Sequence, residues 1–262
     1  MPELSAVIIT WNEEKRIGKC LESVRDIVEE IVVVDSFSTD RTGEICRQHG
    51  ARFIEHAFEG HIEQKNFALS QASNDHVLCL DADEELSKTM QASLREVKKV
   101  WTHDAYSFNR LTWYCGKWIR HSTWYPSRKV RLVDRRKARW EGINPHDNLR
   151  LVQDANRKHL RGDILHYSYE SVAEHEQKIN MYAALASEAY FKAGIRSNPL
   201  KLFINPAWRF LRDYLFELGF LDGHQGFTIA RLSARETYNK YRSIKELYRK
   251  RNNSPAGLEG QA

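Results

Sequence analysis

The sequence predicts an α/β protein: an open, mostly parallel, doubly wound sheet followed by a C-terminal helical extension. Three observations predict this fold class. Apolar runs of strand length alternate with segments of helical periodicity over the first hundred residues. Acidic residues stand where two of these runs end, at the sheet edge where ligands of such folds bind. From Ser171 onward the apolar spacing is helical.

Four apolar runs have the length and composition of buried parallel strands: residues 4–10, 30–34, 51–56 and 76–80. Four helices are expected between and after these strands. The first has Asn12 as its N-cap, and the second has Thr39 or Asp40 as its N-cap and ends at His49. The third spans residues 62–72, and the fourth spans residues 88–100 after the N-cap Ser87. A strand, helix, strand order at this spacing gives right-handed parallel units. We therefore expect Thr10, Asp35 and the pair Asp81 and Asp83 to meet at one edge of the sheet.

The next part of the chain is rich in aromatic and basic residues. It predicts strands at 106–114, 117–121 and 128–133. Between Arg110 and Arg139 there are ten Lys and Arg and a single acid, Asp134. Arg128, Arg131 and their basic neighbours are therefore candidates for binding an anionic group.

The helical region is divided by three start signals. Ser171 and Glu174 form a capping box for a helix that reaches about Lys192. Asn205-Pro206 is expected to begin a second helix, and residues 227–251 a third. These helices carry aromatic and basic side chains, so they suit either the surface of an anionic membrane or packing against other protein.

Composition narrows the class of protein. The net charge of +5 over 262 residues combines −8 for residues 1–104 with +13 for residues 105–262, so the second part suits an anionic partner. No run approaches a membrane span and no signal peptide pattern opens the chain, so we expect a cytoplasmic protein. The four cysteines have neither zinc nor disulfide spacing. Neither a dinucleotide-binding glycine motif nor a Walker loop is present.

Carboxylates are crowded at Asp81-Ala82-Asp83, directly after the fourth predicted strand. Two hard oxygen donors aimed at one point suit Mg²⁺ or Mn²⁺, and such an ion keeps positions for substrate phosphates. The pattern indicates a metal–diphosphate site, with an acidic loop before a helix N-terminus as the alternative. Asp35 likewise either accepts hydrogen bonds from a base or ribose, or caps its own loop.

A candidate general base follows later in the chain. His146 and Asp147 come after Gly142 and Pro145 and are expected on a loop held rigidly by the sheet. A loop acid is ordinarily just solvated, yet Asp147 has the chemistry of a general base.

Together these residues resemble glycosyltransferase family 2, which has the GT-A nucleotide-sugar fold. The similar pieces are residues 5–14 (SAVIITWNEE), 31–40 (IVVVDSFSTD), 64–66 (QKN) and 80–84 (LDADE). His146-Asp147 and the segments 205–210 (NPAWRF) and 219–223 (GFLDG) are similar more narrowly to bacterial lipopolysaccharide inner-core β-1,4-glucosyltransferases. The resemblance extends over roughly residues 4–248 and is most specific in the first hundred.

The resemblance implies a division of the chain. Residues 1–168 would be a GT-A catalytic domain, in which 1–104 bind the nucleotide-sugar and 105–168 face the acceptor. Residues 169–251 would form the helical C-terminal region, and 252–262 a disordered tail.

The resemblance also implies roles for residues. The UDP-sugar would be bound by Thr10, Asn12, Glu13, Asp35, Lys65, Asp81, Ala82 and Asp83. Mn²⁺ or Mg²⁺ would be held by Asp83, Asp81 and His146. Asp147 would be the catalytic base, although the relatives tend to have Glu there, and Glu141 is the second choice. The metal would offset charge on the departing UDP, and a single displacement would invert the anomeric carbon.

The resemblance implies an inverting hexosyltransferase, and glucose is the expected sugar. The expected acceptor is a lipopolysaccharide core or another anionic glycan of the cell envelope. A peripheral contact with the cytoplasmic face of the inner membrane, or a homodimer through the C-terminal helices, is expected. A polyprenyl-phosphate glycosyltransferase would use the same donor site. A nucleic-acid-binding module is disfavoured, because it leaves Asp35, Asp81 and Asp83 unexplained and the chain has no nucleic-acid-binding signature.

Overall fold

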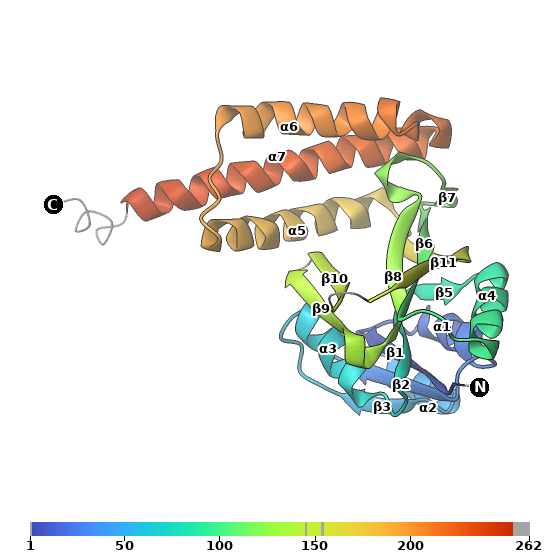
Figure 1. The fold of residues 1–262 in the computed structure, drawn as a ribbon. Helices are drawn as coiled ribbons and strands as arrows, with labels where there is room; N and C mark the ends of the chain where they lie inside the picture. The colour runs from blue at the N-terminus through green and yellow to red at the C-terminus, as the bar shows by residue number, and fades with distance from the viewer. Residues whose placement is uncertain (1, 145, 153–154, 254–262) are drawn as a thin grey trace. The chain divides into compact units, whose positions relative to one another are not determined.

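The computed structural model describes residues 2–144, 146–152 and 155–253, and the chain divides into two compact units (Figure 1). The first unit comprises Met1–Trp113 and Tyr125–Ser168. The second comprises Tyr114–Trp124 and Tyr169–Ala262. The predicted α/β fold with C-terminal helices is confirmed. Segment 114–124 groups with the helices and not with its neighbours in sequence, which the linear pattern did not reveal.

The main sheet has the order β3-β2-β1-β4-β8-β6-β11-β5. Its strands are β1 Leu4–Thr10, β2 Glu30–Asp35, β3 Arg52–Glu55, β4 His76–Asp81, β5 Glu84–Leu86, β6 Ala105–Tyr114, β8 Ser127–Asp134 and β11 Arg157–Tyr169. The first four in the order pair in parallel, as expected from the helical crossovers between them. Beyond β4 the pairs β4–β8, β8–β6 and β11–β5 are antiparallel, so the sheet is mixed. Helical crossovers connect its parallel strands.

Strand register confirms the predicted sheet edge. Thr10 pairs with Asp35 across β1 and β2, and Ile9 pairs with Asp81 across β1 and β4. The carboxyl ends of the neighbouring strands β2, β1 and β4 therefore carry Asp35, Thr10 and Asp81 side by side.

Helices cover both faces of the sheet. The helices of this unit are α1 Ile17–Val24, α2 Thr42–Gln48, α3 His61–Gln71 and α4 Lys88–Lys99. One apolar cluster joins α1, α2 and α4 to the sheet through side chains such as Leu21, Cys46 and Leu94. A second cluster, on the other side of the strands, contains Ala68 and Leu69 of α3 with Trp140. The sheet is doubly wound, with a buried core on each face.

The predicted start of the first helix is wrong by several residues, and that of the second by one or two. Helix α1 begins after Arg16, because Asn12 has a left-handed backbone (φ 52°) and cannot serve as its N-cap. Its Oδ1 instead accepts a hydrogen bond from Thr39 N at 2.8 Å, tying the loop after β1 to the loop after β2. Helix α2 begins at Thr42, whose N–H donates to Asp40 Oδ1. Ser87 caps α4 as predicted, accepting from Met90 N.

The segment that carries His146 and Asp147, expected to be a loop, belongs to a hairpin. Strands β9 Ala138–Ile143 and β10 His146–Leu151 pair antiparallel to each other. Trp140 and Leu149 face each other across this hairpin and are buried in the second core cluster. The burial of these two apolar residues turns the predicted loop into a strand, so His146 and Asp147 lie on β10.

The second unit is an assembly of helices (Figure 1). Its elements are β7 Lys117–Ile119, a 3₁₀ turn Ser122–Trp124, α5 Val172–Lys192, α6 Pro199–Leu211, a π-helical turn Arg212–Phe216, a 3₁₀ turn Gly219–Asp222 and α7 His224–Asn253. Ser171 caps α5 as predicted, and the third helix begins a turn earlier than predicted. Of the predicted tail, residues 252 and 253 belong to α7, and residues 254–262 lie outside the described residues.

The predicted helix start at Asn205-Pro206 is wrong. The same dipeptide occurs seven residues earlier, where Asn198 accepts a hydrogen bond from Lys201 N and Pro199 occupies the first turn of α6. Pro206 lies inside this helix. Because both pairs carry the same local signal, only packing selects the first one.

Buried polar contacts fix the short segment of the second unit. Asp222 is buried and accepts hydrogen bonds from the backbone N–H groups of Arg120 and His121 at 2.8–3.3 Å. Tyr114 OH lies 3.0 Å from His175 Nδ1, and burial lowers the pKa of His175 to about 4. No helix in the described part of the chain is long and apolar enough to cross a membrane.

Candidate functional site

The site is built on the ends of β1, β2 and β4 in the first unit. Asp35 is buried, and its two carboxylate oxygens accept hydrogen bonds from Ser38 N at 2.7 Å and Ser38 Oγ at 2.5 Å. Asp35 therefore caps the loop that follows it, as one of the two sequence interpretations expected. The neighbouring Thr10 Oγ1 is buried and has no hydrogen-bond partner among the described residues. A donor or acceptor is available there for a ligand group.

The loops after β1 and β2 are fastened to one another. Asn12 N donates to Ser38 Oγ at 2.7 Å, and Glu13 N donates to Thr42 Oγ1 at 2.9 Å. Glu13 also forms an ion pair with Arg16 at 3.3 Å. These bonds give the edge around Thr10 and Asp35 a fixed outline before any ligand binds.

Asp81 lies between two buried cations. Lys65 Nζ is 3.1 Å from Asp81 Oδ1, and Arg131 Nη2 is 3.1 Å from Oδ2. Burial raises the pKa of Asp81, but the attraction of Lys65 and Arg131 outweighs it and holds that pKa well below its usual range. Asp81 is therefore a carboxylate at any physiological pH.

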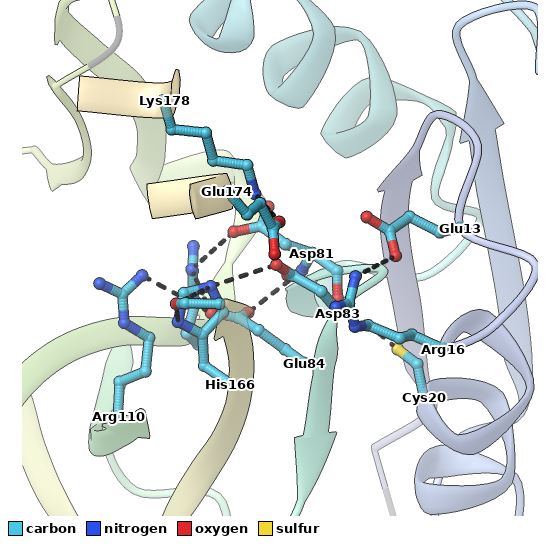
Figure 2. A network of polar contacts seen from close by, with 12 residues as sticks. Glu13, Arg16, Cys20, Asp81, Asp83, Glu84, Arg110, His166, Glu174 and Lys178 are labelled. Atoms are coloured by element: carbon cyan, nitrogen blue, oxygen red, sulfur yellow. Dashed lines mark hydrogen bonds and ion pairs between the residues drawn. The ribbon is translucent and has the colours of Figure 1, made fainter. Parts of the chain in front are cut away.

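Asp83 points to a different partner. The side chain of Ala82 is buried and its N–H donates to Ile9 O at 3.2 Å, which anchors the turn between the two acids. Asp83 Oδ2 lies 3.2 Å from His166 Nε2 on β11 (Figure 2). Burial raises the pKa of Asp83, but His166 lowers it more, so the net shift is downward.

Asp83 and His166 together offer a carboxylate oxygen and an imidazole nitrogen. No group of three or more His, Cys, Asp or Glu side chains within the described ranges has the arrangement of a metal site. Two protein ligands fit a divalent ion that takes its other ligands from phosphates and water. Asp81 is already paired with two cations, so it is less available to a metal than Asp83. The side chain of His146 lies outside the described residues.

Glu84 is a buried acid that sequence reasoning left out of the site. Its Oε1 lies 2.9 Å from Arg131 Nη2 and 4.0 Å from Arg110 Nη1. Its Oε2 accepts a hydrogen bond from Asp81 N at 3.1 Å. Figure 2 shows Glu84 and Arg110 beside the Asp83–His166 pair. Arg131, one of the basic candidates, is thus occupied by two carboxylates.

The hairpin β9–β10 brings Asp147 to this network. Asp147 Oδ2 lies 2.8 Å from Lys65 Nζ, so Lys65 bridges Asp147 and Asp81. Trp140 lies against the same cations, with Lys65 Nζ 4.6 Å and the Arg131 guanidinium 5.3 Å from its ring centroid. Burial lowers the pKa of Lys65, but Asp81 and Asp147 raise it more, so Lys65 remains a cation.

Glu141 is placed differently from Asp147. It follows the buried Trp140 on β9, so it points to the opposite face of the hairpin, and it is exposed. The structure therefore brings Asp147 into contact with the strand-edge residues and leaves Glu141 away from them.

Lys129 is a half-buried cation near other cations. Among the described residues its side chain has neither a hydrogen bond nor an ion pair, and β8 places it two positions from Arg131. Burial, together with Arg110 and Arg131, lowers the pKa of Lys129 to about 8. A ligand anion here would gain a nearby positive charge.

A family model and relatives of similar length agree on one family. The model of "Glycosyl transferase family 2" matches residues 5–158. An uncharacterized glycosyltransferase of Rickettsia typhi is 31% identical over 264 residues, covering 97% of this chain and 90% of the relative. The lipopolysaccharide core biosynthesis glycosyltransferase LpsC of Rhizobium meliloti is 30% identical over 252 residues, covering 91% and 93%. Among solved structures, S. aureus TarS in complex with UDP-GlcNAc has a TM-score of 0.47 at 15% identity, covering 95% and 92%.

Proposed function

Because the chain belongs to glycosyltransferase family 2, we propose that it is an inverting hexosyltransferase. The donor is a UDP-sugar, in the first instance UDP-glucose, and the acceptor is an anionic glycan or glycolipid of the cell envelope. The observation that carries the proposal is the Asp83–His166 pair beside the bridge from Asp147 through Lys65 to Asp81. The similarity to a lipopolysaccharide core glycosyltransferase supports the class of acceptor.

The nucleotide would bind along the edge formed by β1 and β2. The unpartnered hydroxyl of Thr10 and the second lone pairs of Asp35 are available to the base and ribose. The loop carrying Asn12 and Glu13 would border the pocket, and the backbone at Ala82 would let the ribose approach Asp81. In this proposal the catalytic domain corresponds to residues 1–168, with 1–104 binding the donor and 105–168 meeting the acceptor.

A divalent ion would be held by Asp83 and His166. Mn²⁺ or Mg²⁺ at that point would neutralise negative charge on the diphosphate of the leaving group. His146, which the family resemblance assigns to the metal, remains a further candidate ligand. Before the donor binds, Lys65 and Arg131 keep Asp81 ionised and compensate its negative charge.

Asp147 would be the general base. Its carboxylate is oriented by Lys65 at 2.8 Å, on the hairpin that borders the strand edge. An acceptor hydroxyl would give its proton to Asp147 and attack the anomeric carbon, while UDP leaves from the opposite face. Glu141 is the second candidate and would require the acceptor to lie on the other face of the hairpin.

A polyprenyl-phosphate acceptor is a second candidate, favoured by the exposed apolar side chains of α6 in the helical unit, among them Phe203 and Trp208. In either case we propose that the protein works in the cytoplasm at the inner membrane. A homodimer through the C-terminal helices is the alternative use of those side chains.

Calorimetric titration with UDP, with and without Mn²⁺, tests the donor site. We expect binding that depends on the metal in the wild type and is lost in Asp83→Asn. Asp26→Asn is the matched control, because Asp26 is exposed and outside the site. Metal-independent binding that survives in Asp83→Asn would overturn the assignment. Absence of UDP binding to the wild type would redirect the search to other nucleotides.

A further inference from the structure

The outward side of α6 is an apolar surface that the described residues leave exposed. Its residues, here called the α6 face, are Leu200, Phe203, Ile204, Ala207, Trp208 and Leu211. The five large side chains among them are 61%, 62%, 55%, 52% and 41% exposed, in chain order. Exposed large apolar residues occur singly on most proteins, whereas a contiguous set marks an interaction site.

The spacing of the α6 face is the spacing of a core-facing stripe. Its members fall at positions 0, 3, 4, 7, 8 and 11 along the helix, which is one side of a period of ~3.6 residues. The helix packs mainly through other residues: Leu202 is buried, and Phe210 meets the ring of Phe227 at 5.9 Å. Of the α6 face, Phe203 also lies 6.4 Å from the ring of Tyr238 on α7, yet stays 62% exposed. Helix α6 therefore has two apolar sides, and only one is used inside the unit.

The apolar surface continues beyond the end of α6. In the π-helical turn Leu215 is 48% and Phe216 66% exposed, and the Phe216 ring lies 5.5 Å from that of Trp208. Phe220 and Leu221 of the following 3₁₀ turn are also exposed. Trp and Phe are the side chains that settle most readily at a membrane–water boundary.

The charges around the α6 face distinguish between a second copy of the chain and a lipid surface as its binding partner. Residues 189–212 contain five Lys and Arg and no Asp or Glu: Lys192, Arg196, Lys201, Arg209 and Arg212. Asp213, the first acid after them, is buried and pairs with Arg209 and Arg212 at 2.6 and 3.1 Å. Among the described residues, the cations of this stretch without an ion pair are therefore Lys192, Arg196 and Lys201. A second copy docked face to face would bring like charges together. An anionic lipid surface would instead complement them.

We propose that the α6 face lies in the headgroup region of an anionic lipid bilayer, with α6 parallel to the membrane plane. Leu200, Phe203 and Trp208 enter the apolar boundary, and the flanking Lys and Arg contact lipid phosphates. The contact itself stands on the helical unit alone. It implies in addition that the acceptor is encountered at a lipid surface, and only this implication rests on the proposed function.

Flotation of the full-length protein with vesicles tests this contact without donor or acceptor. Vesicles of phosphatidylcholine with phosphatidylglycerol should bind the wild type, and vesicles of phosphatidylcholine alone should bind it far less. Phe203→Ser combined with Trp208→Ser should weaken binding by about tenfold or more, because two apolar side chains no longer leave water. The control is Met181→Ser with Leu185→Ser on α5, at similarly exposed positions, which should bind as the wild type does.

Thermal unfolding of both double variants ensures that a folded protein is compared. Salt should weaken the binding of the wild type to anionic vesicles, and Lys192→Glu with Arg196→Glu should do the same without touching the apolar face. The proposal is overturned if the wild type ignores anionic vesicles. It is also overturned if Phe203→Ser with Trp208→Ser leaves vesicle binding intact, or if sedimentation shows a wild-type dimer that these changes convert to a monomer. UDP titration tests the proposed function separately, because neither double variant to Ser changes a residue at the ends of β1, β2 and β4.

Discussion

Replacing Lys65 by Met would remove the cation that joins Asp81 to Asp147. At 2.8 Å from Asp147, a unit charge pair is worth about 6 kcal/mol at an effective dielectric constant of ~20, before desolvation is subtracted. Breaking a buried pair by deleting one partner costs about 3–5 kcal/mol, because the other charge stays buried and unpaired. Arg131 still compensates Asp81, so we expect the free energy of unfolding to fall by about 3 kcal/mol.

The pH dependence separates charge from packing. The folded pKa of Asp81 lies below its unfolded value of about 3.9, so its ion pairs stabilise the fold above that pH and this contribution is lost as pH falls. The deficit of Lys65→Met should therefore be largest near neutrality and shrink below about pH 4. Urea unfolding at a series of pH values measures it.

Lys129→Met is the matched control for that experiment. Lys129 has its pKa lowered to about 8, chiefly by burial, so its charge disfavours the folded state at neutral pH. Removing that charge should leave the free energy of unfolding unchanged or raise it. A deficit of Lys65→Met that is equal at all pH values, or one matched by Lys129→Met, would refute the charge argument.

Two further substitutions test other parts of the structure. His166→Gln should reduce the Mn²⁺-dependent part of UDP affinity by about tenfold while leaving thermal unfolding near that of the wild type, since it removes one proposed metal ligand; a normal titration would contradict that role. Asp222→Ala should lower the free energy of unfolding by about 1–3 kcal/mol, because the N–H groups of Arg120 and His121 lose their buried acceptor; an unchanged urea midpoint would contradict it.

The strand edge was predictable because its signal is local. Each of β2 and β4 is an apolar run that ends in an acid, and right-handed crossovers bring the ends together. The order of elements in the first hundred residues therefore followed from periodicity. Asp35, Asp81 and Asp83 could be picked out without any knowledge of their partners.

The partners of those acids were not predictable, because they come from distant strands with mixed patterns. His166 lies on β11, whose sequence alternates basic, polar and apolar residues without a clear period. Lys65 was singled out by family resemblance, yet its bridge between Asp81 and Asp147 depends on the hairpin β9–β10. That hairpin forms because Trp140 and Leu149 become buried, which only tertiary packing decides.

The helical unit illustrates the same limit. Asn198-Pro199 and Asn205-Pro206 carry identical start signals, and the sequence offers no local reason to prefer the first. The apolar residues of α6 were expected to form one broad face. The structure divides them into a packed side with Phe210 and an exposed side with Trp208.

The proposed reaction is a single displacement at the anomeric carbon, with Asp147 as the base. Slow hydrolysis of UDP-α-glucose, followed by proton NMR before the product anomers equilibrate, tests it most directly. We predict β-glucose as the first product, formed only with a divalent cation and lost in Asp147→Asn but not in Glu141→Gln. If α-glucose forms first, or if Asp147→Asn retains full hydrolysis, the account of the mechanism is contradicted.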